Sequence, residues 1–361
     1  MTAFRSADDL RASLRRAGLE PFADAIVCSS KPVLLFLRRQ ALDDSLPATS
    51  KIGGFPDLPE DFAWPTRPPY PDAARRAAAA LDFARTTAAN WEPQVDGPLE
   101  PHQRRIPRAE VDRLAVAADA RGRAFASAFP LAFVGQIDLA ALSGQTGFPA
   151  EFPRSGVFSV FEDVTAEGVE GAPALFYHDV PRDRLKRTPP PDRLVEHVDL
   201  CGGYGLGGVE PWAKLTLAET LEPFPALAVP HHWKSAFPAG SLDWERIWDW
   251  FQSGDGEYVP LAPAAEDESA DALQAGHFGD RLGGWPNPIQ GDPETELDGV
   301  RITTPGRTPW RQLFAYGGEF YAGTRRMGSD GKGDGATYHL IDAGALGDRR
   351  FEAARWTYQM D

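Results

Sequence analysis

Apolar residues recur at helical spacing in one early segment and run continuously in the next. Leu10 and Leu14 follow the segment Ser6-Ala7-Asp8-Asp9, which resembles a capping box, and Gly18 stands where a helix of about three turns would end. The apolar run at 33–37 has the length of a buried strand. These patterns predict an N-terminal helix followed by a buried strand.

Two further regions have helix-forming patterns. Residues 72–129 are rich in Ala and Arg, and the proline-bearing segment 91–107 divides them into two stretches. Between residues 241 and 253, large apolar side chains recur every three or four positions, and Gly254 follows. We expect a pair of helices in the first region and one helix in the second, whose aromatic stripe favours core packing over a ligand slot.

Three blocks of sequence occur twice in the same order. In the first block, each copy has a basic residue, a branched apolar residue, two glycines, an aromatic residue and a proline in the same register. The matched pairs are 51–59 with 281–289, 130–139 with 310–316, and 155–163 with 334–342. The distance from the first block to the second is longer in the first copy by about 50 residues. We interpret the helical region 72–129 as an insertion into that copy.

Each copy reads as a Gly-Gly-aromatic-Pro turn followed by two short strands, a unit too small to cover its own apolar face. The sequence therefore predicts an α+β fold built by internal duplication, in which two related halves with short-stranded antiparallel or mixed sheets pack together. The expected organisation is an N-terminal helix and strand at 1–49, a first half at 50–200 that contains the insertion, a connecting segment at 201–275 with its helix at 241–253, and a second half at 276–361.

Composition and charge narrow the class of protein. The chain has 361 residues, of which 42% are hydrophobic, and this is enough for a folded core. A net charge of -15 disfavours nucleic-acid binding, which needs a dense basic face. Residues 255–299 hold 11 acids and one base. This stretch is either a solvated connection or a surface for a partner with a basic surface.

The cysteines and the N-terminal residues predict a cytoplasmic protein without membrane segments. Cys28 and Cys201 stand far apart and have no CxxC partner, which favours a reducing compartment. The first nine residues include two acids and no apolar core of a signal peptide. The run at 33–37 is far shorter than the roughly 20 residues that a membrane-spanning helix needs.

Two glycine-containing motifs resemble known sites. Residues 203–208 satisfy G-x-G-x-x-G, and 195–200 could be a strand before them, but the βαβ pattern of a dinucleotide site is missing, so we interpret them as a flexible loop. Residues 330–335 have the outline of a calcium loop. Because Lys332 occupies the third position and Ile341 stands where a Glu is needed, a tight turn is the better interpretation.

The sequence nominates no catalytic residue, metal ligand or cofactor. None of the seven histidines is placed at the i, i+4 spacing of a helical zinc site, although a metal site built from distant residues stays open. The chain lacks a G-x-S-x-G motif, and its paired carboxylates cannot be placed relative to one another. The sequence leaves open whether the protein is an enzyme, but it favours a protein without catalytic activity.

The repeated turns supply the remaining candidates. Phe55 and Trp285 either fill the core where the two halves meet, or help to frame a groove for a small ligand or peptide. The candidate ligand-binding residues are Gly53, Gly54, Phe55, Trp64, Gly283, Gly284, Trp285, Gln290 and Asp334.

The chain resembles the YwqG-like family, also called domain of unknown function 1963. The match is carried by 50–59 with Trp64-Pro65, 130–139, Ser155-Gly156, 282–286 with Ile289-Gln290, and 333–335. The resemblance implies an α+β fold of two related halves, found in bacterial proteins of mostly unassigned activity, some of them near toxin and immunity genes. Residues 315–319 and 332–335 depart from the family's Gln, acidic and Trp pattern, which puts a site in the second half in doubt.

Taken together, these features predict a non-catalytic binding or interaction protein. The sharper form of the prediction is an immunity-type role, in which the acidic stretch 255–299 contacts a basic partner. The alternative is an enzyme or small-ligand binder that uses a cleft between the two halves.

Overall fold

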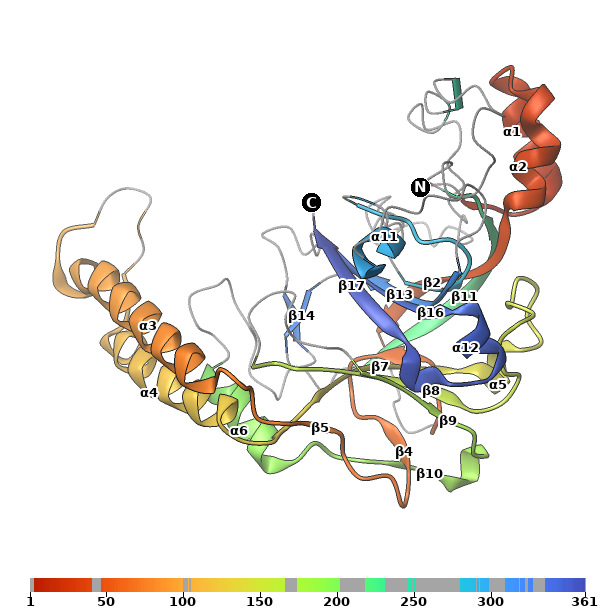
Figure 1. Ribbon diagram of the computed structural model, residues 1–361. Helices are drawn as coiled ribbons and strands as arrows, with labels where there is room; N and C mark the ends of the chain where they lie inside the picture. The colour runs from red at the N-terminus through yellow and green to blue at the C-terminus, as the bar shows by residue number, and fades with distance from the viewer. Residues whose placement is uncertain are drawn as a thin grey trace.

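A large, curled antiparallel sheet forms the centre of the computed structural model, and helices lie around it (Figure 1). The residues described are 3–40, 47–99, 103, 105–165, 174–201, 218–230, 246–247, 250, 280–289, 291, 293–298, 309–317, 319–321, 324–326 and 335–360. The predicted helix at 241–253 lies mostly outside these residues, as do the glycine motif at 203–208, most of the acidic stretch, Gln290 and Asp334.

The sheet has one continuous order of strands. Across it run β17 (Arg355–Met360), β16 (Gly335–Asp342), β13 (Trp310–Gly317), β12 (Arg281–Gly283), β2 (Lys31–Gln40), β11 (Glu219–Ala228), β3 (Lys51–Ile52), β7 (Ala132–Asp138), β8 (Val157–Glu162) and β9 (Ala174–His178), with β1 (Ala3–Phe4) paired to β11. All these pairs are antiparallel. The fold is therefore α+β.

The long strands β2 and β11 join the two predicted halves. They pair with each other from Lys31↔Ala228 to Gln40↔Glu219. β12 pairs with the other edge of β2, and β3 pairs with the other edge of β11. The buried strand predicted at 33–37 is confirmed as part of β2, but the expectation of separate sheets is wrong, because this central pair connects both sets of short strands into one sheet.

The strand pairing on the two sides of the centre follows the same pattern. Lys51 of β3 lies opposite Gln136, as Arg281 of β12 lies opposite Ala315. In the next pair outward, the register shifts between Phe133 and Gly135 on one side and between Gln312 and Phe314 on the other.

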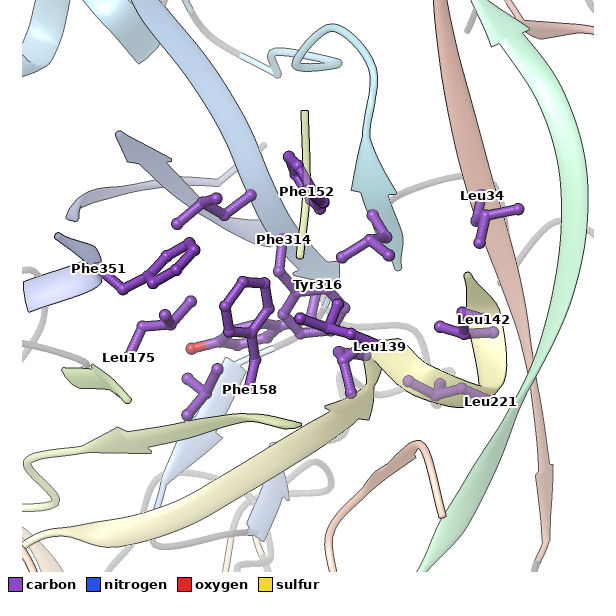
Figure 2. Close-up of a cluster of buried hydrophobic side chains, with 14 of the residues drawn as sticks. Leu34, Leu139, Leu142, Phe152, Phe158, Leu175, Leu221, Phe314, Tyr316 and Phe351 are labelled. Atoms are coloured by element: carbon purple, nitrogen blue, oxygen red, sulfur yellow. The ribbon is translucent and has the colours of Figure 1, made fainter. Parts of the chain in front are cut away.

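Both sets of strands contribute to one core inside the curled sheet. Figure 2 shows Phe158 of β8 close to Phe314 and Tyr316 of β13, all with at most 1% of their surface exposed. Phe351, from the short 3₁₀ helix η5 (Phe351–Ala353), lies 5.0 Å from Phe158 and 4.7 Å from Tyr177 between ring centroids. The segment before β17 thus packs on β8 and β9, so the sheet curls back on itself.

The N-terminal helix forms where the sequence predicts it. α1 (Ala7–Arg16) is capped by Ser6, whose hydroxyl accepts a hydrogen bond from the amide of Asp9 at 3.1 Å. Its apolar face packs with η1 (Glu20–Phe22) and α2 (Ala23–Ser29) around the buried Trp250. Two shorter helices, α5 (Leu139–Leu142) and α12 (Ala343–Gly347), each follow a sheet strand and begin after a capping aspartate.

Two long helices occupy the Ala- and Arg-rich region, as predicted. α3 (Ala73–Asp96) and α4 (Arg108–Phe125) form a hairpin that projects from the sheet on the side away from α1 (Figure 1). α6 (Asp192–Cys201) packs against α4. The strand suggested at 195–200 is wrong, because Leu194, His197, Val198 and Cys201 form one buried helical face.

Short elements complete the fold. They are β10 (Leu185–Arg187) paired with β4 (Asp57–Pro59), β5 (Thr66–Arg67) paired with β6 (Phe129–Pro130), β14 (Glu319–Tyr321) paired with β15 (Thr324–Arg326), η3 (Arg182–Arg184) and α11 (Pro293–Asp298). In the parts of the chain that the structure describes, each helix is too short or too polar to traverse a bilayer.

Candidate functional site

The two Gly-Gly turns have the same backbone conformation. Gly53 and Gly54 have φ of 73° and 71°, and Gly283 and Gly284 have φ of 72° and 74°. All four glycines thus adopt the left-handed conformation, which residues with a Cβ rarely adopt. This requirement explains why both copies have Gly-Gly at this position. A Cβ on Gly283 would also overlap Pro149, so here the glycine permits close packing within the protein.

The sheet places the two turns at opposite ends of its central strands. Gly283 lies beside Val33, near one end of β2. Ile52 lies beside Glu219, which itself pairs with Gln40 at the other end of β2. Val33 and Gln40 are seven residues apart, which is about 24 Å along an extended strand. The glycines of the two turns therefore do not line one common groove.

The first turn holds a buried ionic network. Lys51 and Asp57 are both fully buried, with 3.5 Å between Nζ and Oδ2. Arg187 donates from Nε to Oδ1 of Asp57 at 2.7 Å. Gln136 donates to Oδ2 of Asp57 at 2.8 Å and accepts from the Asp57 amide at 2.9 Å, and the amide of Ala48 donates to the same Oδ2 at 3.1 Å. The carboxylate is thus held by two cations and two neutral donors.

These contacts fix the charge of Asp57. Burial would raise the pKa of this carboxyl group, but the hydrogen bond from Arg187, the charge of Lys51 and the hydrogen bond from Gln136 outweigh it and lower the pKa. Asp57 therefore stays ionised at neutral pH. A carboxylate with so many fixed donors suits a structural role better than proton transfer.

A pocket of about 300 Å³ lies at the ends of β7, β8 and β9. The carboxylate of the buried Asp138 pairs with Arg182, whose side chain remains 55% exposed. Ser155 and Asp179 also line the pocket, and the hydroxyl of Ser155 donates to Asp179 at 2.7 Å. The pocket thus presents an exposed cation together with hydroxyl and carboxylate groups, near the lower end of the size range of ligand pockets.

The second turn has a different charge pattern. Arg281 takes the place of Lys51 and is 4% exposed, but Asn287 stands where the first turn has Asp57. Its guanidinium donates from Nη1 to the carbonyl oxygen of Trp285 at 3.4 Å. The hydroxyl of Tyr338 donates to the carbonyl oxygen of Asn287 at 2.6 Å. Burial lowers the pKa of Arg281 to about 10, which leaves it charged.

The aromatic residues of the two turns differ in their burial. Trp285 is 9% exposed, packs against Val33 and Ala228, and donates from Nε1 to the carbonyl oxygen of Ser29 at 2.7 Å. Phe55 is only half-buried. The structure thus places Trp285 in a packed cluster on the outer face of β2 and β11.

Trp64 belongs to another part of the fold. It is half-buried, lies 5.4 Å from Phe161 between ring centroids, and donates from Nε1 to the carbonyl oxygen of Leu131 at 2.8 Å. Among the candidates from the sequence, Phe55 and Trp64 lie between β3 and β5, and Trp285 follows β12. Gln290 and Asp334 are outside the described residues.

Burial is the main cause of the shifted pKa values of three histidines and of Cys201. Burial lowers the pKa of His178 and His197 to about 4 and that of His339 to about 3, and it raises the pKa of the Cys201 thiol. Within the described ranges, no group of three or more His, Cys, Asp or Glu side chains is arranged to hold a metal ion.

The sequence did not identify the residues that complete the network and the pocket. Arg182 and Arg187 come from a segment more than 120 residues after Asp57, and nothing in the local pattern links them to it. A signal did exist in β7, where Gln136 and Asp138 alternate with apolar residues in a strand that is buried throughout. Buried polar residues in such a strand require partners.

A family model described as "Domain of unknown function (DUF1963)" matches residues 50–360. No curated protein matches the chain.

Proposed function

The chain belongs to the YwqG-like family, DUF1963, whose domain has no assigned function, and we propose that it is a binding protein that performs no covalent chemistry. The observation that carries this proposal is the state of Asp57. Its carboxylate accepts hydrogen bonds from Ala48, Gln136 and Arg187, and its pKa is lowered. The most deeply buried acid at the repeated motif therefore holds the scaffold together, as a rigid binding module requires.

We infer that this scaffold arose by internal duplication. The support is the matching register of β3 with β7 and of β12 with β13, together with the register shifts at corresponding places in the next pairs. On this interpretation, the hairpin α3–α4 is an insertion into the first half. The domain boundaries proposed from the sequence follow from the same reasoning.

The proposed partner is a protein with a basic surface, and the proposed contact is the acidic stretch 255–299. The support is its composition of 11 acids and one base within a chain of net charge -15. Two of these acids, Asp280 and Glu294, are buried and take no part in the proposed contact. An immunity-type role, in which the protein neutralises a basic partner, fits this charge. The same charge disfavours a nucleic-acid partner.

The location proposed for this activity is the bacterial cytoplasm. Cys28 and Cys201 are both free thiols, and Cys28 is exposed. Free exposed thiols persist in a reducing compartment.

The test is capture of the partner from native cells followed by a salt titration. A complex driven by acidic residues must weaken steeply between low and high salt. A variant that replaces Glu266, Asp267, Glu268 and Asp271 by their amides should lose most of the binding. The matched control replaces four exposed acids elsewhere, Asp8, Asp24, Asp82 and Asp348, and should keep it. Equal binding by both variants would refute this partner surface.

A second candidate function is small-ligand binding, favoured by the pocket beside Asp138. Its exposed Arg182 suits a ligand with an anionic group, and Ser155 and Asp179 suit a hydrogen-bond donor on the same ligand. A thermal-shift screen of amino acids and short peptides tests this candidate. A ligand of the pocket should stabilise the wild-type protein but not Arg182→Ala, whereas Arg154→Ala, at an exposed arginine outside the pocket lining, should respond like the wild type.

A further inference from the structure

The two Gly-Gly turns differ in how they compensate a buried cation. In each turn a basic residue stands two positions before the first glycine and is almost completely buried, Lys51 in one and Arg281 in the other. A buried cation is costly unless an anion and hydrogen-bond acceptors compensate it. The first turn supplies Asp57 for Lys51. The second turn has Asn287 at the matching position, six residues after its base.

Asp280, the acid next to Arg281 in the chain, is engaged elsewhere. Asp280 precedes it in the chain, so its side chain points to the other face of the sheet. There, Asp280 accepts a hydrogen bond from Nη2 of Arg38 at 2.6 Å and another from the amide of Gly317 at 3.0 Å. Among the described residues, the guanidinium of Arg281 has one hydrogen bond, to the carbonyl oxygen of Trp285, and no carboxylate within ion-pair distance.

Trp285, which accepts the hydrogen bond from Arg281, also contacts a second cation. Lys31 lies over the indole ring of Trp285, with Nζ 3.3 Å from the ring centroid, whereas Arg281 donates to the carbonyl oxygen of the same residue. Burial and the nearby charge of Arg311 lower the pKa of Lys31 to about 8, although Glu294 and Glu151 act in the opposite direction. Gln312 donates from Nε2 to the carbonyl oxygen of Gly283 in the same turn at 2.7 Å, and its buried Oε1 atom has no hydrogen-bond partner among the described residues.

We propose that Arg281 binds the carboxylate group of an external ligand, in the place that Asp57 occupies beside Lys51. A planar guanidinium binds a carboxylate through two parallel hydrogen bonds, and the half-buried Lys31 adds a second positive charge at the same turn. An unpaired amide acceptor such as that of Gln312 suits a ligand that also carries an N–H or O–H donor. Arg281 lies within the stretch 255–299, but the partner contact is tested at residues 266–271, so either proposal can fail without the other.

The experiment is a set of thermal melts with sodium acetate, sodium succinate, a short peptide with a free C-terminal carboxylate, the same peptide amidated, and sodium phosphate. Ionic strength is held constant with sodium chloride. Wild-type protein should show a saturable increase in Tm with the carboxylates, about 2 °C at ten times the dissociation constant. A response to succinate and acetate identifies a small acid as sufficient, and a response to the free but not the amidated peptide identifies a peptide terminus. A response to phosphate alone would overturn the assignment to carboxylates.

Two variants separate binding from a structural role of Arg281. Arg281→Met removes the cation that lacks a carboxylate, so the ligand-free variant should melt at or above the wild-type temperature and lose the carboxylate response. Asn287→Asp places an internal carboxylate at the position of Asp57, so it should raise Tm without ligand and also abolish the response. If Arg281→Met melts several degrees lower and Asn287→Asp keeps the wild-type response, Arg281 is structural and the proposal is wrong.

Discussion

The ammonium group of Lys51 lies 3.5 Å from the carboxylate of Asp57, and both side chains are fully buried. Removing one partner of such a pair leaves the other charge without its counterion in the interior. Lys51→Met should therefore lower the free energy of unfolding by about 3–5 kcal/mol, measured by urea denaturation.

A surface pair provides the matched control for Lys51. Lys186 pairs with Glu60, and their side chains are 61% and 74% exposed. Lys186→Met should cost less than about 1 kcal/mol. The double variant Lys51→Met, Asp57→Asn should recover part of the loss. If the Lys51 and Lys186 variants cost the same, the buried pair does not have the stabilising role inferred from its geometry.

His339 makes the stability of the protein depend on pH. Its side chain is 1% exposed, and burial lowers its pKa to about 3, below the ordinary value of about 6.5 in an unfolded chain. Between these values the unfolded chain binds a proton that the folded protein does not, so stability should fall as the pH is lowered from 6.5 toward 3. His178 and His197 act in the same direction.

Replacing His339 isolates its share of this effect. The slope of unfolding free energy against pH should decrease in His339→Phe by up to about 1.4 kcal/mol per pH unit. The measurements belong between pH 4.5 and 6, because the lowered pKa of Asp57 adds a loss of stability at more acidic pH, as its carboxylate takes up a proton. An unchanged slope would show that His339 is protonated in the folded protein.

The sequence predicted the elements whose causes are local. The capping box at Ser6, the apolar run in β2 and the Ala-rich stretches of α3 and α4 were each visible within a short window. The strand suggested at 195–200 failed because Leu194, Val198 and Cys201 follow helical spacing, which a six-residue window hides.

The remaining features depend on contacts between distant residues. Nothing near β2 indicates that β11, almost 190 residues later, pairs with it and unites both sets of strands. The network at Asp57 likewise requires Arg187, which pairing of β10 with β4 brings opposite it. The repeated Gly-Gly motif was recognised from the sequence. That the two turns lie at opposite ends of the central strands followed only from the strand register.

Gly283 should tolerate no side chain, for two physical reasons. Its φ of 72° is strained for any residue with a Cβ, and that Cβ would overlap the ring of Pro149. Gly283→Ala should lower the free energy of unfolding by more than about 1 kcal/mol. Gly144→Ala is the control, because a Cβ there meets no atom within 4 Å. Equal stability of both variants in urea denaturation would contradict the close packing at Gly283.

Trp285 distinguishes a packed turn from an open ligand site. Its ring packs against Val33 and Ala228, and its Nε1 donates to the carbonyl oxygen of Ser29. Because the surrounding strands cannot collapse into the space of an indole, Trp285→Ala should lower the free energy of unfolding by about 3–5 kcal/mol. Trp285→Phe keeps most of the packing and loses the hydrogen bond, so it should cost much less than Trp285→Ala, with about 1 kcal/mol of its cost due to that bond.

The control for Trp285 is a large-to-small change at an exposed apolar position. Val116 is 51% exposed on α4, so Val116→Ala should change stability by less than about 0.5 kcal/mol. If Trp285→Ala behaves like Val116→Ala, the indole is not part of the packed cluster. In that case the position of the Trp285 carbonyl oxygen beside Arg281 would also not be fixed by packing of the indole.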